Sequence, residues 1–274
     1  MRQKPLYISA PSRSGSSLLV RMLNCTSNMV IVNEPINSVN IVDKTNIKAI
    51  FNTIKNDLED GFIMQRVDVN GREATDTFPP SKMRWGRINH PFDGVEVVGI
   101  KKSFPAFSNE DFFKPFIREW PVFVEWMNKT MNGCVVAILR NPRLTILSWK
   151  TTFEALKEST ENQCLAWNLI ANTILSSQDL GVRIIRYEDL VQNPTPAVET
   201  VADLLGVEVR FKENLPNIKQ FSLEDYLRNK GISADSAEIE FRLIERLCGE
   251  TAEKLGYSTM CELSSLQPTK GELS

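Results

Sequence analysis

The feature that most constrains the fold of this 274-residue chain is a series of short, mainly apolar runs separated by segments with helical periodicity. Such runs suit strands that are buried on both faces, and strands of this kind form parallel sheets covered by helices. Strands are expected at residues 5–10, 29–32, 95–100, 134–139 and 182–187, and helices at residues 16–23, 46–58, 112–131, 143–156, 161–177, 197–205 and 238–255. The pattern predicts an α/β fold in which residues 1–274 form a single domain, with a central parallel β-sheet flanked by helices.

Two stretches depart from this alternation. Residues 61–93 are irregular, except that Asn70-Gly71 lies between β-like runs and predicts a hairpin with a type I′ turn. Because long irregular segments in compact domains are often functional, residues 61–93 are expected to form a lid or acceptor-site insertion. In the long helix expected near the middle of the chain, Pro115 and Pro121 are expected to mark starts or breaks.

Composition narrows the possible classes of function. The formal net charge of −2 argues against a general nucleic-acid-binding protein, which usually carries a basic surplus. The sequence has no apolar run of the length that a membrane span needs and no apolar signal-peptide core near Met1, so we expect no membrane insertion and a cytoplasmic location. The cysteines are never spaced as CxxC, which argues against a zinc site or a disulfide framework and fits a reducing compartment. They are Cys25, Cys134, Cys164, Cys248 and Cys261.

The loop after the first expected strand has the composition of an anion-binding site. It contains Arg13-Ser14-Gly15-Ser16-Ser17, directly at the start of an expected helix. Small residues let successive backbone N–H groups point inward, and the helix N-terminus adds its positive end, so the loop can hold a phosphate-like anion. Arg13 adds a permanent charge, while Ser16 and Ser17 add hydroxyl donors. A Walker A loop needs a Lys directly before its final hydroxyl residue, and the lack of that Lys argues against an ATP or GTP hydrolase.

The same loop resembles the 5′-phosphosulfate loop of the sulfotransferases that use 3′-phosphoadenosine 5′-phosphosulfate (PAPS). The resemblance covers Arg13, Ser14, Gly15, Ser16 and Ser17. In that family the loop holds the 5′-phosphate and the departing sulfuryl group, and the domain has a P-loop NTPase-like α/β fold. The resemblance therefore implies PAPS as the cofactor, 3′-phosphoadenosine 5′-phosphate (PAP) as its product, and no requirement for a metal.

A second motif of this family follows the strand expected at residues 134–139. Arg140 at the end of that strand and Ser148 in the following helix resemble, in type and spacing, the family's pair of residues on the 3′-phosphate of the cofactor. The forked donors of an arginine suit phosphate oxygens. The segment YEDL at residues 187–190 resembles a further family motif, for which we expect a structural role.

The base that receives the acceptor proton is indicated by the resemblance alone. Many cytosolic members use a His in a Lys-x-His pattern, but the corresponding place here reads Lys101-Lys102-Ser103. A branch that includes tyrosylprotein and bacterial sulfotransferases uses a Glu after the second strand, which makes Glu34 the first candidate. The only histidine, His90, is the second candidate. Lys101, or Lys102 in the alternative register, resembles the family Lys that neutralises charge on the departing nucleotide.

Together these residues predict a sulfotransferase that moves a sulfuryl group from PAPS to a hydroxyl or amine of an acceptor. Arg13 is expected both to bind the cofactor and to stabilise the transferring group. The acceptor can be a small molecule, a peptide or a carrier-bound chain, and no oligomeric state is indicated. One alternative is a P-loop-type small-molecule kinase, which would need a Walker Lys and Mg²⁺ ligands. The other is a non-catalytic adenosine-phosphate-binding domain, which would need no base.

Overall fold

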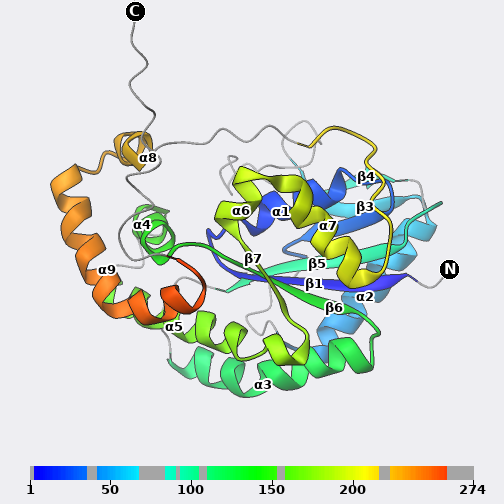
Figure 1. Ribbon diagram of the computed structural model, residues 1–274. Coiled ribbons are helices and arrows are strands. Elements are labelled where there is room, and N and C mark those ends of the chain that lie inside the picture. The colour runs from blue at the N-terminus through cyan, green and yellow to red at the C-terminus, as the bar shows by residue number, and fades with distance from the viewer. Residues whose placement is uncertain are drawn as a thin grey trace, which may run out of the picture.

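The computed structural model describes residues 3–35, 42–67, 84–90, 93–104, 110–152, 158–215 and 223–257. At its centre is a five-stranded sheet with the order β2-β5-β1-β6-β7, in which all pairings are parallel (Figure 1). The strands are β1 (Lys4–Pro11), β2 (Met29–Asn33), β5 (Val97–Phe104), β6 (Cys134–Leu139) and β7 (Arg183–Arg186). The five strands expected from the sequence are therefore confirmed. Because β1 is the central strand, the loop that follows it lies between the carboxyl ends of β5 and β6, where ligands bind in open parallel sheets.

Helices cover both faces of this sheet, as Figure 1 shows for α1 and α7 on one face and α3 and α5 on the other. The helices are α1 (Ser16–Asn24), α2 (Lys44–Glu59), α3 (Glu110–Lys129), α4 (Pro142–Thr152), α5 (Thr160–Leu175), α6 (Tyr187–Gln192), α7 (Pro194–Leu205), α8 (Leu223–Lys230) and α9 (Ala234–Lys254). The prediction of a single α/β domain with a central parallel sheet flanked by helices is confirmed.

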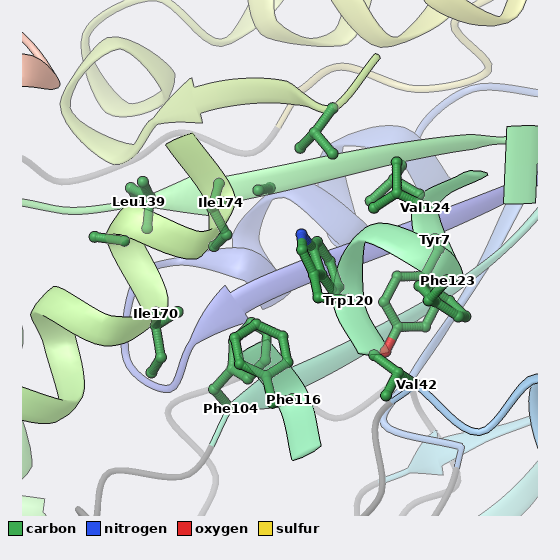
Figure 2. Packing of buried hydrophobic residues seen from close by; sticks show 14 of the residues in the cluster. Tyr7, Val42, Phe104, Phe116, Trp120, Phe123, Val124, Leu139, Ile170 and Ile174 are labelled. Carbon is green, nitrogen blue, oxygen red and sulfur yellow. The ribbon is translucent and has the colours of Figure 1, made fainter. Parts of the chain in front are cut away.

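An aromatic cluster fills the core between the sheet and α3 (Figure 2). Tyr7 of β1 packs edge-on against Phe123, with ring centroids 4.8 Å apart, and Trp120 stacks on Phe123 at 5.8 Å. Phe104, the last residue of β5, meets Phe116 edge-on at 4.4 Å. Aromatic pairs of this kind add to the stabilisation that burial alone provides. The carboxyl end of β5 is thereby fixed against α3.

The structure corrects the expectation for the two prolines of α3. Pro115 and Pro121 lie inside one continuous helix and neither starts nor breaks it. Each proline removes a helical hydrogen bond, which costs about 3 kcal/mol. Burial of the aromatic side chains on the inner face of α3 offsets that cost, because each fully buried side chain contributes about 1.5–3 kcal/mol. Like the other helices in the described ranges, α3 is not long and apolar enough to cross a membrane.

Residues 61–93 were expected to be irregular apart from one hairpin, but the structure has a second sheet in this segment. β3 (Phe62–Val67) and β4 (Arg84–Asn89) form an antiparallel pair whose last register pair joins Val67 and Arg84. These strands carry charged and amide residues, which weaken the apolar signal on which strand prediction depends. The hairpin turn expected at Asn70-Gly71 lies outside the described residues, and the lid role of this segment stays a prediction.

Candidate active site

The loop between β1 and α1 folds back tightly at the carboxyl edge of the sheet. The N–H of Ser12 donates to the Phe104 carbonyl at 2.9 Å, and that of Ser14 donates to the Pro11 carbonyl at 3.2 Å. Arg13 and Gly15 both have left-handed backbone conformations, with φ of 66° and 84°. Among the described side chains none caps the start of α1, so the first backbone N–H groups of this helix are available to an anion.

Tyr187 and Arg140 close one side of this loop. The ring of Tyr187, the first residue of α6, lies so near Gly15 that a Cβ there would be 2.2 Å from its Cδ2 atom. On the same ring rests the guanidinium of Arg140, with Cζ 4.5 Å from the ring centroid. Nη1 of Arg140 also donates to the backbone carbonyl of Arg13 at 3.3 Å. The stack of Gly15, Tyr187 and Arg140 therefore sets the position of a cation beside the loop.

Replacing Gly15 with alanine should destabilise the protein and weaken its binding of anions. The new Cβ would overlap the Tyr187 ring, and the left-handed φ disfavours any side chain, so we expect a loss of about 2–4 kcal/mol in the free energy of unfolding. Urea unfolding measures the loss. Gly94→Ala is the matched control, since Gly94 has a φ of 86° but nothing within 4 Å of its Cβ position. An equal loss in both variants would show that the contact with Tyr187 contributes nothing.

Helix α4 holds the opposite side of the loop through two consecutive residues. The Oγ of Ser148 accepts a hydrogen bond from Nε of Arg13 at 3.2 Å. The indole N–H of Trp149 donates to the carbonyl of Ser12 at 2.6 Å. Ser148 and Trp149 are both buried. The sequence placed Arg13, Arg140 and Ser148 at one site, and the structure brings these three residues together around the loop.

A buried ion cluster lies on the other flank, where β2 and β5 end. Glu34 follows β2, and its Oε1 accepts hydrogen bonds from Nζ of Lys101 at 2.9 Å and from the backbone N–H of Ser103 at 2.8 Å. Its Oε2 lies 3.3 Å from Nζ of Lys102. The side chains of Lys101, Lys102 and Glu34 are only 5%, 14% and 16% exposed. Both lysines thus reach the same carboxylate, although neighbouring residues of a strand point to opposite faces of the sheet.

These contacts keep Glu34 ionised. Burial alone would raise the pKa of this carboxyl group, but Lys101 and Lys102 together with the hydrogen bonds from Lys101 and Ser103 lower it below the ordinary value. Glu34 is therefore a carboxylate at neutral pH. It can accept a proton, although its lowered pKa makes it a weak base. Its φ of 51° is left-handed, a conformation that costs a non-glycine residue free energy and that the surrounding bonds must impose.

Ser17 joins this ion cluster to the anion-binding loop. Its Oγ accepts from Nζ of Lys101 at 3.4 Å and from Nδ2 of Asn33 at 3.3 Å. Lys101 therefore lies between the carboxylate of Glu34 and the first turn of α1. Lys102 is the more exposed of the two lysines, and the role expected for one of them stays a prediction.

The unpaired polar groups of the site fit an anionic cofactor. Within the described part of the chain, the buried hydroxyls of Ser9, Ser12 and Ser14 and the Nε of Arg140 have no hydrogen-bond partner. Buried polar groups are rarely left in that state in native proteins, so a ligand with several acceptor oxygens suits the site. The donors here, with the start of α1, match a nucleotide that carries phosphate and sulfate groups, such as PAPS.

His90, the second candidate for the base, is not part of the site that these residues form. His90 lies at the end of β4, where its backbone N–H donates to the Gly61 carbonyl at 3.0 Å, and it is not among the residues that the bonds above connect.

Glu188 of the YEDL segment accepts from the Asn141 N–H at 3.0 Å, which agrees with a structural role. Tyr187, the first residue of that segment, also has a structural role, since its ring packs under Arg140 and against Gly15. The motif pointed to the residue, but no sequence signal shows that its ring reaches Gly15.

These features define a class of protein: an α/β domain with an anion-binding loop after the central strand and two cationic flanks. A family model described as the sulfotransferase domain matches residues 3–240. The chain belongs to this sulfotransferase family, whose members transfer sulfuryl groups. Among proteins with curated descriptions, no sequence matches this chain.

Several solved structures resemble this one. A sulfotransferase from Alicyclobacillus acidocaldarius is 13% identical, with 97% of this chain and 99% of that chain covered and a TM-score of 0.48. The sulfotransferase domain from the curacin biosynthetic pathway is 16% identical, with 94% and 99% covered and a TM-score of 0.48. Mouse sulfotransferase SULT7A1, complexed with PAP, is 10% identical, with 94% and 90% covered and a TM-score of 0.42.

Proposed function

We propose that this protein transfers a sulfuryl group from PAPS to a hydroxyl or amine of an acceptor. The observation that carries the proposal is the meeting of Arg13, Arg140 and Ser148 around the uncapped start of α1. Two arginines and a helix N-terminus at one point supply positive charge to a nucleotide that carries several negative charges. Membership of the sulfotransferase family supports the same reaction class.

The binding roles follow from the chemistry of each group. Arg140 and Ser148 would hold the 3′-phosphate, because a guanidinium and a hydroxyl offer several donors to phosphate oxygens. The 5′ side would bind along the loop, where Ser14, Ser16 and Ser17 add hydroxyls to the backbone N–H groups of α1. When bound, PAPS supplies an activated sulfuryl group whose leaving group is PAP. Arg13 would then stabilise the charge on the transferring group.

The second part of the proposal concerns the proton of the acceptor. Glu34 would receive it, since this carboxylate is ionised and lies beside the loop. A weak base suffices if the proton leaves late in a loose transition state. Lys101, which bonds both Glu34 and Ser17, would hold the carboxylate in place and offset charge that develops on the leaving group. The acceptor would be a small molecule, a peptide or a carrier-bound chain.

Titration with PAP tests the cofactor assignment. Wild-type protein should bind PAP, and Arg140→Ala should weaken binding by about 10–150-fold, because a hydrogen-bonded charge contributes about 1.5–3 kcal/mol. Isothermal titration calorimetry measures both affinities. Arg118→Ala is the control, because Arg118 lies on the exposed surface of α3 with its side chain 77% exposed. ATP with Mg²⁺ is titrated in parallel.

The outcomes separate the competing functions. PAP binding that weakens in Arg140→Ala but not in Arg118→Ala supports the assignment and justifies a screen of hydroxyl and amine acceptors with PAPS. Equal or tighter binding of Mg²⁺-ATP would contradict it and favour a kinase. Binding of PAP without turnover of any acceptor would favour a non-catalytic nucleotide-binding domain.

A further inference from the structure

The outer edge of β2 is covered by two side-chain amides instead of a sixth strand. The amide of Asn24, at the end of α1, both accepts from the N–H of Ile31 at 2.8 Å and donates to its carbonyl at 3.0 Å. The amide of Gln65, from β3, donates to the same Ile31 carbonyl at 3.1 Å and accepts from the N–H of Asn33 at 3.0 Å. Together they satisfy the outward N–H and carbonyl of Ile31 and the outward N–H of Asn33, the residue before Glu34.

Gln65 is unusual among these groups because it comes from the second sheet and is almost fully buried, with 1% of its surface exposed. It lies within β3, paired in register with Gly86 of β4. A buried amide without partners costs free energy, so the two bonds to β2 hold the hairpin strands against the main sheet. Gln65 thus connects the β3–β4 pair to the strand that ends at the ion cluster.

The bonds that Gln65 makes to β2 lie next to the backbone bonds that hold Glu34. The N–H of Glu34 donates to the Lys101 carbonyl at 2.9 Å on one side, and the N–H of Asn33 donates to Gln65 on the other. Glu34 itself, directly after Asn33, has the left-handed φ of 51°. A conformation of this kind persists only where neighbouring contacts impose it. The side chain of Asn33 also donates to Ser17, so its position affects the anion-binding loop.

We propose that Gln65 is a positioning residue for Glu34: its amide fixes the peptide between Val32 and Asn33, one peptide before the one that carries the Glu34 N–H, and thereby helps to aim the carboxylate at Lys101, Ser103 and the loop after β1. The catalytic part of this inference rests on the proposed function, in which Glu34 receives the acceptor proton. It also gives the β3–β4 pair a role, because any displacement of that pair would reach Glu34 through one side chain.

The ionisation of Glu34 tests this proposal without an acceptor. Gln65→Met keeps the length of the side chain but removes both bonds to β2, so the peptide at Asn33 can relax and the carboxylate can move away from Lys101 and Ser103. We expect the pKa of Glu34 to rise toward the ordinary glutamate value. Carboxyl ¹³C NMR of glutamate-labelled protein measures it, with the Glu34 signal assigned by its loss in Glu34→Gln.

Asn24→Leu is the matched control, because Asn24 bonds the same edge of β2 at Ile31, three residues before Glu34. We expect both variants to lower the thermal midpoint, while the pKa of Glu34 rises only in the Gln65 variant. An unchanged pKa in Gln65→Met, or an equal rise in both variants, would overturn the positioning role. If Gln65→Met does not fold, Gln65→Asn serves instead, since its amide is one methylene too short to reach both backbone groups.

The same experiment keeps the two proposals apart. Failure of the wild-type protein to bind PAP would remove the proposed function, but the comparison of pKa values would still decide whether Gln65 positions Glu34. Conversely, PAP binding with an unchanged pKa of Glu34 in Gln65→Met would leave the proposed function intact and remove this inference alone.

Discussion

Replacing Glu34 with glutamine is expected to slow sulfation of the acceptor by about 10²–10⁴-fold, which is the usual contribution of a general base. The amide cannot receive a proton, yet it has nearly the shape of the carboxylate. PAP should bind with nearly unchanged affinity, because Arg140, Ser148 and the loop after β1 do not depend on this charge. Single-turnover kinetics with PAPS and an acceptor identified by the screen would measure the rate, and calorimetry the affinity.

Glu96→Gln provides a matched control for that experiment. Glu96 is a shielded carboxylate with 18% of its side chain exposed, it pairs with Arg210 at 3.4 Å, and it lies just before β5 rather than near its end. This variant should sulfate the acceptor at the wild-type rate. If Glu34→Gln also retained full activity, Glu34 would be a structural ion-pair partner. His90→Ala would then become the next variant to measure.

The central sheet could be predicted because its strands are buried on both faces. The stretch at residues 134–139 is apolar throughout, and the strand found there has the expected limits. The strand expected at residues 95–100 is instead Val97–Phe104, four residues longer at its carboxyl end. The extension contains Lys101 and Lys102, and charged residues normally argue against a buried strand. Glu34 forms an ion pair with each of these lysines, but this partner comes from a distant part of the chain and leaves no local signal.

The same reasoning explains why the second sheet was missed. Gln65 is one of its most buried residues, although glutamine in a sequence suggests an exposed position. Its partners are backbone groups of Ile31 and Asn33, which carry no side-chain signature. A buried amide that bonds to the backbone of another element in this way cannot be predicted from a periodic pattern.

In the candidate site, too, some residues could be predicted from the sequence and others could not. Arg13, Arg140 and Ser148 were identified because their types and spacing resemble a family motif, and the structure brings them together. Tyr187 was assigned only a structural role, because its contact with Gly15 requires the end of β7 to meet the loop after β1. Motifs therefore located the residues that the structure brings together around the loop after β1, whereas the residues that support them depend on tertiary packing.

Lys101→Met should have the largest effect on stability among the variants of the ion cluster. The change removes a buried cation and leaves the Glu34 carboxylate without its closest partner, so we expect the free energy of unfolding to fall by about 3 kcal/mol. This value is at the low end for a broken buried pair, because Lys102 and the N–H of Ser103 still contact Glu34. Urea unfolding at neutral pH measures it. Lys102→Met should cost less, since Lys102 is more exposed and Lys101 remains in place.

The dependence of stability on pH gives the same ion cluster a second test. The pKa of Glu34 is lower in the folded state than in the unfolded state, so the unfolded state binds more protons as the solution is acidified. The stabilisation by Glu34 is therefore complete above the ordinary glutamate pKa and is lost as the pH falls from that value through the lower pKa of the folded state. Wild-type protein should lose more stability than Glu34→Gln over that acidic range. Equal losses in the two proteins would mean that the lysines do not stabilise the ionised carboxylate.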